Sequence, residues 1–205
     1  MSAECCPPNA PPDPRLRRVL WLALILNAAM FAIELVGGFA SRSSSLLADA
    51  VDFFGDAANY AITLVVLPWG IAWRARAALI KAASMGAYGM GVLAFAMWSA
   101  YQGVVPEPTT MSVIGFMALM VNVLVAVLLY SFRTGDSNLR SVWLCSRNDA
   151  IGNLAVLAAA AGVFGTGSGW PDIFVAIGMA LLAMTASVTV LRQARAELAI
   201  APHTH

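Results

Sequence analysis

Residues 46–56 read Leu-Leu-Ala-Asp-Ala-Val-Asp-Phe-Phe-Gly-Asp, so three aspartates, Asp49, Asp52 and Asp56, interrupt an otherwise apolar stretch. The stretch lies inside a longer apolar segment, residues 44–69, which is long enough for a membrane-spanning helix of about 20 residues. An ionisable side chain deep in such a span costs about 2.5–3.5 kcal/mol on insertion scales. Each of the three aspartates therefore needs a physical reason to be there.

The rest of the chain is as apolar as this stretch. Of its 205 residues, 60% are hydrophobic and only 11% are charged, whereas a soluble domain carries roughly 25% charged residues. Six segments are long and apolar enough to span a bilayer: 16–40, 44–69, 77–101, 111–132, 138–164 and 171–191. Because lipid offers no partner to an open strand edge, each segment must be helical. We predict an all-α integral membrane bundle of six transmembrane helices.

The basic residues predict how this bundle is oriented. Most of them lie at the start of the first segment, around the connection between the second and third, around the connection between the fourth and fifth, or after the sixth: Arg15, Arg17, Arg18, Arg74, Arg76, Lys81, Arg133, Arg140, Arg192 and Arg195. Arg42 is the only basic residue on the other side. Cytoplasmic loops carry the excess of such residues, so both termini are predicted to be cytoplasmic. We expect a disordered tail at 1–14, a membrane domain at 15–197 and a short tail at 198–205.

Helical spacing groups the aspartates of the second segment on one face. At about 100° per residue, Asp52 and Asp56 lie about 40° apart, and Asp49 lies within about 60° of both. Cys145 and Asp149 repeat the same four-residue spacing in the fifth segment. Two helices that each carry such a pair can close four side chains around one ion. We predict that Asp52, Asp56, Cys145 and Asp149 are metal ligands.

The chemistry of these four ligands suits a transition metal. Four protein ligands in a tetrahedron are typical of zinc, and a thiolate adds preference for borderline or soft ions. Fully ionised, the four groups would carry about four negative charges, so some must be protonated when the metal is absent. Metal entry would then expel protons, and proton entry would expel metal. This competition is the physical basis of proton-coupled antiport.

Other polar residues have two interpretations each. Asp49 and Glu34 are candidate proton sites, and Asn27 and Asn153 could support the ligands, but each could equally be a packing residue. Arg147 lies about 200° from the Cys145–Asp149 stripe and could pair with Glu34 or Asp49. Weaker candidates for capture of a metal ion lie in the two tails: Cys5, Cys6, His203 and His205.

These residues resemble the cation diffusion facilitator family of metal/proton antiporters. The pattern Asn27-xxx-Phe31-xx-Glu34-xx-Gly37, followed by Leu-Leu-Ala-Asp-Ala at 46–50, resembles that family's first and second spans. Asp52-xxx-Asp56 is similar to its metal-binding pair, and Cys145-xxx-Asp149 matches the second pair with cysteine in a position that is often histidine. The resemblance implies a six-helix fold, a homodimer, and export of Zn²⁺-type ions (Zn²⁺, Cd²⁺ or Co²⁺) from the cytoplasm in exchange for protons. It implies no permanent cofactor.

Departures from the family leave several alternatives open. Most members carry a cytoplasmic C-terminal domain that dimerises, and this chain is expected to be a short form without it, so membrane helices would hold the dimer. If Cys145 stays protonated, the site becomes harder and more open to Mn²⁺ or Fe²⁺. A passive cation channel is a further alternative. No metalloprotease or hydrolase motif occurs, so we expect no enzyme, and a net charge of +1 suggests no nucleic-acid partner. We expect the inner membrane of a bacterium.

Overall fold

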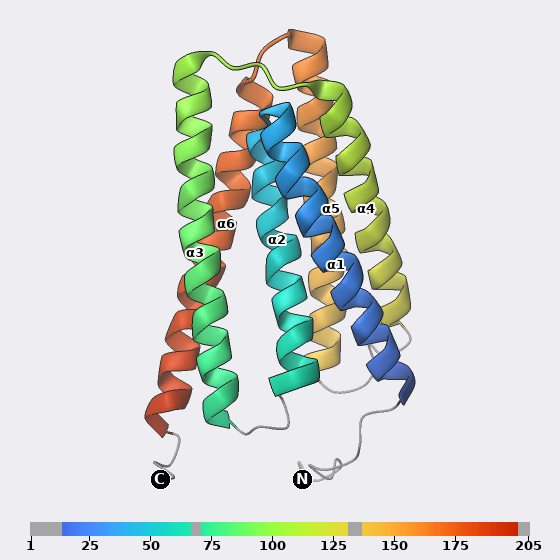
Figure 1. Ribbon diagram of the computed structural model, residues 1–205, viewed down its shortest axis with the longest axis vertical. Helices are drawn as coiled ribbons and strands as arrows, with labels where there is room; N and C mark the ends of the chain where they lie inside the picture. The colour runs from blue at the N-terminus through green and yellow to red at the C-terminus, as the bar shows by residue number, and fades with distance from the viewer. Residues whose placement is uncertain (1–13, 67–70, 131–136, 201–205) are drawn as a thin grey trace.

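The computed structural model describes residues 14–66, 71–130 and 137–200. Within them the chain forms α1 (Pro14–Ser41), α2 (Ser44–Ala61), a π-helical turn η1 (Ile62–Val66), α3 (Ile71–Gln102), α4 (Pro108–Tyr130), α5 (Ser137–Thr166) and α6 (Trp170–Ile200). Successive helices run in opposite directions, so α1 begins and α6 ends at the same end of the bundle (Figure 1). We call this the terminal end. The opposite end, with the connections 42–43, 103–107 and 167–169, is the loop end.

Each segment predicted from the sequence corresponds to one of these helices. In the second segment, regular α-helix stops at Ala61 and η1 continues it to Val66, while residues 67–70 lie outside the described part. Helix α6 extends to Ile200, into the segment that we expected to be a tail. The predicted N-terminal tail falls almost entirely on residues 1–13, which are outside the described residues.

Helix α2 occupies the centre of the bundle. It contacts each of the other five α-helices, and no other described helix does so; Figure 1 shows it between the α3–α6 pair and the helices α1, α4 and α5. Its apolar side chains Leu46, Val51 and Phe53 are almost completely buried. Protein rather than lipid therefore surrounds α2, which is why this helix can carry three aspartates.

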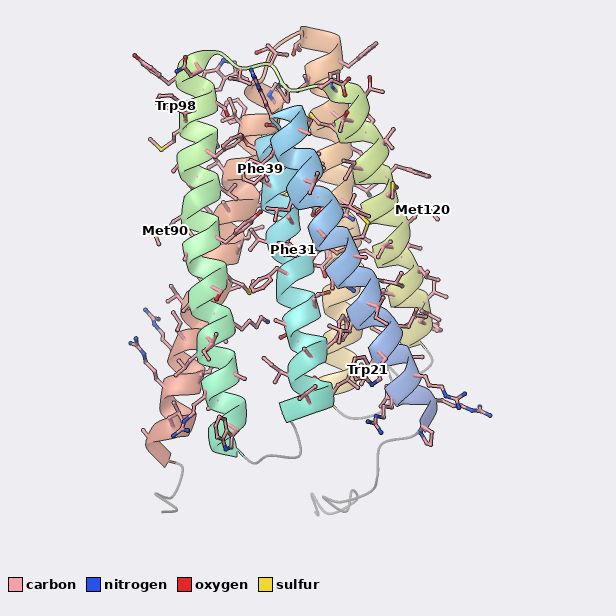
Figure 2. All side chains as sticks on the ribbon, viewed as in Figure 1. Trp21, Phe31, Phe39, Met90, Trp98 and Met120 are labelled. Carbon is pink, nitrogen blue, oxygen red and sulfur yellow. The ribbon has the colours of Figure 1, made fainter. Side chains whose placement is uncertain are left out.

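The outer surface of the bundle has the character of a membrane protein. Five helices are long and apolar enough to cross a bilayer, and α2, with its three aspartates, is the exception. Exposed Trp and Tyr side chains gather toward both ends: Trp21, Trp73 and Tyr130 toward the terminal end, and Trp98, Tyr101 and Trp170 toward the loop end. Between them, Met90 and Met120 point outward on opposite flanks (Figure 2). Such aromatic belts mark the two membrane–water interfaces. The predicted all-α membrane bundle is confirmed.

The connections at the loop end are tight because they use left-handed residues. Helix α1 ends with Arg42 at φ 57°, where Ser43 N–H bonds Gly38 O (2.9 Å) and Arg42 N–H bonds Phe39 O (3.3 Å). This is a Schellman motif, in which glycine normally takes the left-handed position. Helix α3 ends in the same way at Gly103, with φ 62°. The loop end therefore has one strained residue, Arg42, where its counterpart is glycine.

Replacing Arg42 with glycine is expected to stabilise the protein by about 1 kcal/mol, because the left-handed conformation costs a residue with a Cβ about that much free energy. The measurement is the unfolding midpoint in detergent micelles. Gly103→Ala is the matched control and should destabilise by about 1 kcal/mol for the same reason. If both variants unfold like the wild type, the two turns are not held in this conformation.

Candidate metal centre

The aspartates of α2 lie near the middle of the bundle. At a rise of about 1.5 Å per residue, Asp52 and Asp56 are about 12 and 18 Å from the start of the helix, within a hydrocarbon core of about 30 Å. Both side chains are half-buried, whereas Asp49, one turn nearer the loop end, is 1% exposed. Two carboxyl groups of α2 are thus accessible at mid-depth, and the third is sealed.

Helix α5 brings a further carboxyl group to this place. Asp149 is half-buried, and its carboxyl group lies near enough to Asp56 of α2 for the two groups to act on each other electrostatically. Asp52 and Asp49 are also near enough to act on it electrostatically. One Asp149 oxygen, Oδ2, has no hydrogen-bond partner among the described residues. The structure therefore unites Asp52, Asp56 and Asp149, which the sequence predicted to share a site.

The complete four-ligand cage is not part of what the structure describes. The backbone of Cys145 lies in α5 one turn before Asp149, but its side chain is outside the described part. Among the described side chains, no group of three or more His, Cys, Asp or Glu converges closely enough to hold a metal ion. The grouping of Asp52, Asp56 and Asp149 is therefore looser than a formed coordination shell. The role of all four residues as ligands stays a prediction.

A second pair of carboxyl groups lies on the loop-end side of these three. Glu34 of α1 is 0% exposed and lies next to Asp49 of α2, with Asp52 also within electrostatic range. Neither Glu34 oxygen has a hydrogen-bond partner among the described residues, and Asp49 Oδ2 has none either. Oxygens buried without partners are costly. This pair is therefore a place where a proton or a cation would be stabilising.

Two buried asparagines, one on α1 and one on α5, carry unpaired polar atoms. Asn27 donates from Nδ2 to Ala23 O (2.8 Å), which leaves its Oδ1 unpaired, and both polar atoms of Asn153 are unpaired. Both residues are 0% exposed. Arg147 was predicted to pair with Glu34 or Asp49, but its side chain lies outside the described part of the chain. The same holds for the tail residues Cys5, Cys6, His203 and His205.

Asp172 is a residue that the sequence reasoning missed. It lies in the first turn of α6 and is 1% exposed, and it accepts hydrogen bonds from Ser43 Oγ (2.7 Å), Ser44 N–H (2.7 Å) and Ser45 N–H (2.9 Å). Ser43 in turn accepts from Leu46 N–H (3.1 Å) as the N-cap of α2. The sequence shows an acid at the start of α6, which is a usual place for one. No local signal shows that it caps a different helix.

Lys81 is the second such residue. In the sequence, Lys81 indicated only how the bundle is oriented. In the structure, its ammonium group donates a hydrogen bond to Asn59 Oδ1 of α2. The charge of Lys81 also acts on the Asp56 carboxyl group. Among the described side chains it is the basic group that acts on the acidic cluster. Its place on α3 could not be related to α2 without the packing of the two helices.

Known proteins resemble this chain over nearly all of its helices. A model of the cation efflux transmembrane domain matches residues 20–199 of this chain. The metal cation efflux system protein CzcD of Cupriavidus metallidurans is 28% identical, over 82% of this chain and 58% of its own length. The cadmium, cobalt and zinc/H(+)-K(+) antiporter of Bacillus subtilis is 25% identical, over 86% of this chain and 61% of its own length. The chain thus spans less than two thirds of each relative.

Proposed function

Because this chain belongs to the cation efflux family, the cation diffusion facilitators that its motifs resemble, we propose that it carries divalent transition-metal cations out of the cytoplasm in exchange for protons. The family is one of transporters and not of enzymes, as the sequence predicted. No nucleic acid or permanent cofactor takes part in the proposed activity.

One observation carries the proposal: three half-buried carboxyl groups from two helices lie within electrostatic range of one another at mid-depth in a membrane bundle. Asp52 and Asp56 come from α2 and Asp149 from α5, and both carboxyl groups of α2 are near enough to act electrostatically on that of Asp149. Substrate sites of membrane carriers lie near the bilayer midplane between packed helices. With Cys145 one turn from Asp149 along α5, the two helices would supply the four ligands that a Zn²⁺-type ion needs.

We favour Zn²⁺, Cd²⁺ and Co²⁺ as the transported ions. The Bacillus subtilis relative is named for cadmium, cobalt and zinc, and a ligand set of three carboxylates and a thiolate suits borderline ions. If Cys145 remains a thiol, the three aspartates form a harder site that suits Mn²⁺ or Fe²⁺. The ion is cargo in either case.

Protons are proposed to move through the acidic groups. Crowded carboxyl groups cannot all be ionised in an empty site, so metal and protons compete for Asp52, Asp56 and Asp149. The sealed pair Glu34 and Asp49 lies between this site and the loop end and offers unpaired oxygens. It is suited to hold a proton on the way. Asn27 and Asn153 are proposed to support the ligands with their unpaired, buried polar atoms.

The transport cycle requires the site to face each side of the membrane in turn. Exposed arginines extend from the bundle at the terminal end (Figure 2), and such residues favour the cytoplasmic side. The terminal end is therefore proposed to be cytoplasmic and the loop end to face outward, in the inner membrane of a bacterium. A homodimer held by membrane helices remains a prediction from the family.

The experiment is metal transport into proteoliposomes that contain the purified protein. Zn²⁺, Cd²⁺, Co²⁺ and Mn²⁺ are offered with and without a pH gradient, to the wild type, Asp52→Asn and Cys145→Ser. The transport rate of Asp52→Asn should fall by ~10²-fold or more, because the bound metal ion loses one of its buried, negatively charged partners. The control Glu107→Gln removes an exposed carboxyl group at the loop end and should transport like the wild type.

Each outcome of this experiment has a clear meaning. Saturable transport that needs the pH gradient and is lost in Asp52→Asn supports the antiporter. Rapid flux that does not saturate and ignores the gradient would indicate the passive channel instead. A Cys145→Ser variant that loses Zn²⁺ and Cd²⁺ but keeps Mn²⁺ would assign the thiolate as a ligand. No transport of any of these ions by folded protein would refute the carrier function.

A further inference from the structure

Lys81 reaches from α3 to the segment of α2 that carries Asp56. Its ammonium group donates to Asn59 Oδ1, and its Cε lies 4.0 Å from the position that a Cβ on Gly55 would take. Gly55 and Asn59 bracket Asp56 on α2. The side chain of Lys81 therefore crosses α2 at the level of the carboxyl group that lies nearest the terminal end.

The position of the Lys81 ammonium group inside the bundle is explained by the Asp56 carboxyl group. Lys81 is the only lysine in the chain, and it lies ten residues, about 15 Å, after the start of α3 at Ile71. A charge at this depth is costly unless it is paired or reaches water. The Asp56 carboxyl group is close enough for the two charges to act on each other. The nearby carboxyl group thus stabilises the ammonium group inside the bundle.

Resting on the proposed transport function, we propose that Lys81 is the internal counter-ion of the empty site, which a divalent cation displaces toward the terminal end when it binds at Asp56. A metal ion and an ammonium group cannot share the same carboxyl group without strong repulsion. Lysine suits this role because it is a compact charge on a flexible stem. Such a stem can also extend to the interface and place its charge in water.

This displacement has a consequence for transport. A tethered cation weakens metal binding, because part of the binding free energy is used to move it away. It also keeps the site from holding the metal too tightly, since the returning ammonium group assists release. Lys81 is therefore a positioning and affinity-setting residue, and it is not itself a metal ligand.

The test compares three variants by equilibrium Zn²⁺ binding to purified protein at pH 8, where protons compete least, and by transport kinetics. Lys81→Gln keeps a donor for Asn59 but removes the charge, and it should lower the Kd for Zn²⁺ at least tenfold, lower KM and lower kcat. Lys81→Arg keeps the charge and should stay within about threefold of the wild-type Kd. Asn59→Ala removes the hydrogen bond alone and should leave the Kd unchanged.

The outcomes separate this proposal from the proposed function. If the wild type transports Zn²⁺ and Lys81→Gln binds it with unchanged Kd and KM, the counter-ion role is wrong while the transporter stands. If Asn59→Ala changes the Kd as much as Lys81→Gln does, the hydrogen bond rather than the charge matters, and the proposal fails. If folded wild-type protein transports none of the metals offered, the proposed function itself is refuted, whatever Lys81→Gln does to Zn²⁺ binding.

Discussion

Asp149→Asn is expected to weaken Zn²⁺ binding by ~10²- to 10³-fold and to abolish measurable transport. Removing one partner of a buried charge pair costs about 3–5 kcal/mol, and each tenfold change in affinity corresponds to about 1.4 kcal/mol. Asparagine has the same shape as aspartate, so the helix packing should survive. The measurement is Zn²⁺ affinity of the purified protein by calorimetry, together with uptake into proteoliposomes.

The matched control for Asp149 is another aspartate, Asp49. It lies beside Glu34 on the loop-end side of the proposed ligands, so Asp49→Asn should keep Zn²⁺ affinity within about tenfold of the wild type. The transport of Asp49→Asn should respond less to the pH gradient, because the sealed pair would lose a protonatable group. Equal losses of affinity in both variants would mean that α5 contributes no more to the site than Asp49 does.

Asp172→Ala is expected to destabilise the protein by about 3–5 kcal/mol, the typical cost of breaking a buried charged interaction. Its carboxylate accepts three hydrogen bonds at the start of α2, two of them from the backbone N–H groups of Ser44 and Ser45. Without it these buried donors lose their partner, and the negative charge at the helix N-terminus is lost as well. The measurement is unfolding of the purified protein in detergent against a denaturant series.

Glu107 is the control for Asp172, because it is also a capping carboxylate at the loop end. It accepts from Thr109 N–H (2.9 Å) and Thr110 N–H (2.6 Å) at the start of α4, and these hydrogen bonds, those from Thr110 first, lower its pKa to about 2. The hydrogen bonds that lower this pKa stabilise the fold at pH values above the pKa of Glu107 in the unfolded chain. This stabilisation is lost as the pH falls through about 2. Because Glu107 is fully exposed, Glu107→Ala should destabilise far less than Asp172→Ala. Similar effects would contradict the burial argument.

The spacing of single residues predicted which faces of two helices carry carboxyl groups. An i and i+4 spacing places Asp52 with Asp56, and Cys145 with Asp149, on one face of each helix, and the structure places Asp149 near the two carboxyl groups of α2. Spacing alone also placed Asp49 with them, whereas the structure seals Asp49 against Glu34 of α1. A helical wheel describes one helix, and the neighbour that a face meets is decided by packing.

The sequence by itself determined the six helical segments, their alternating directions and the polar faces of α2 and α5. These follow from local properties: the free energy of transferring about 20 apolar residues into lipid and the fixed geometry of a helix. Only the tertiary structure decided that α2 lies at the centre, that Asp172 of α6 caps it, and that Lys81 of α3 reaches Asn59 beside Asp56. The physical reason is that contacts between helices depend on how complete side-chain surfaces fit together, and no single segment encodes that fit.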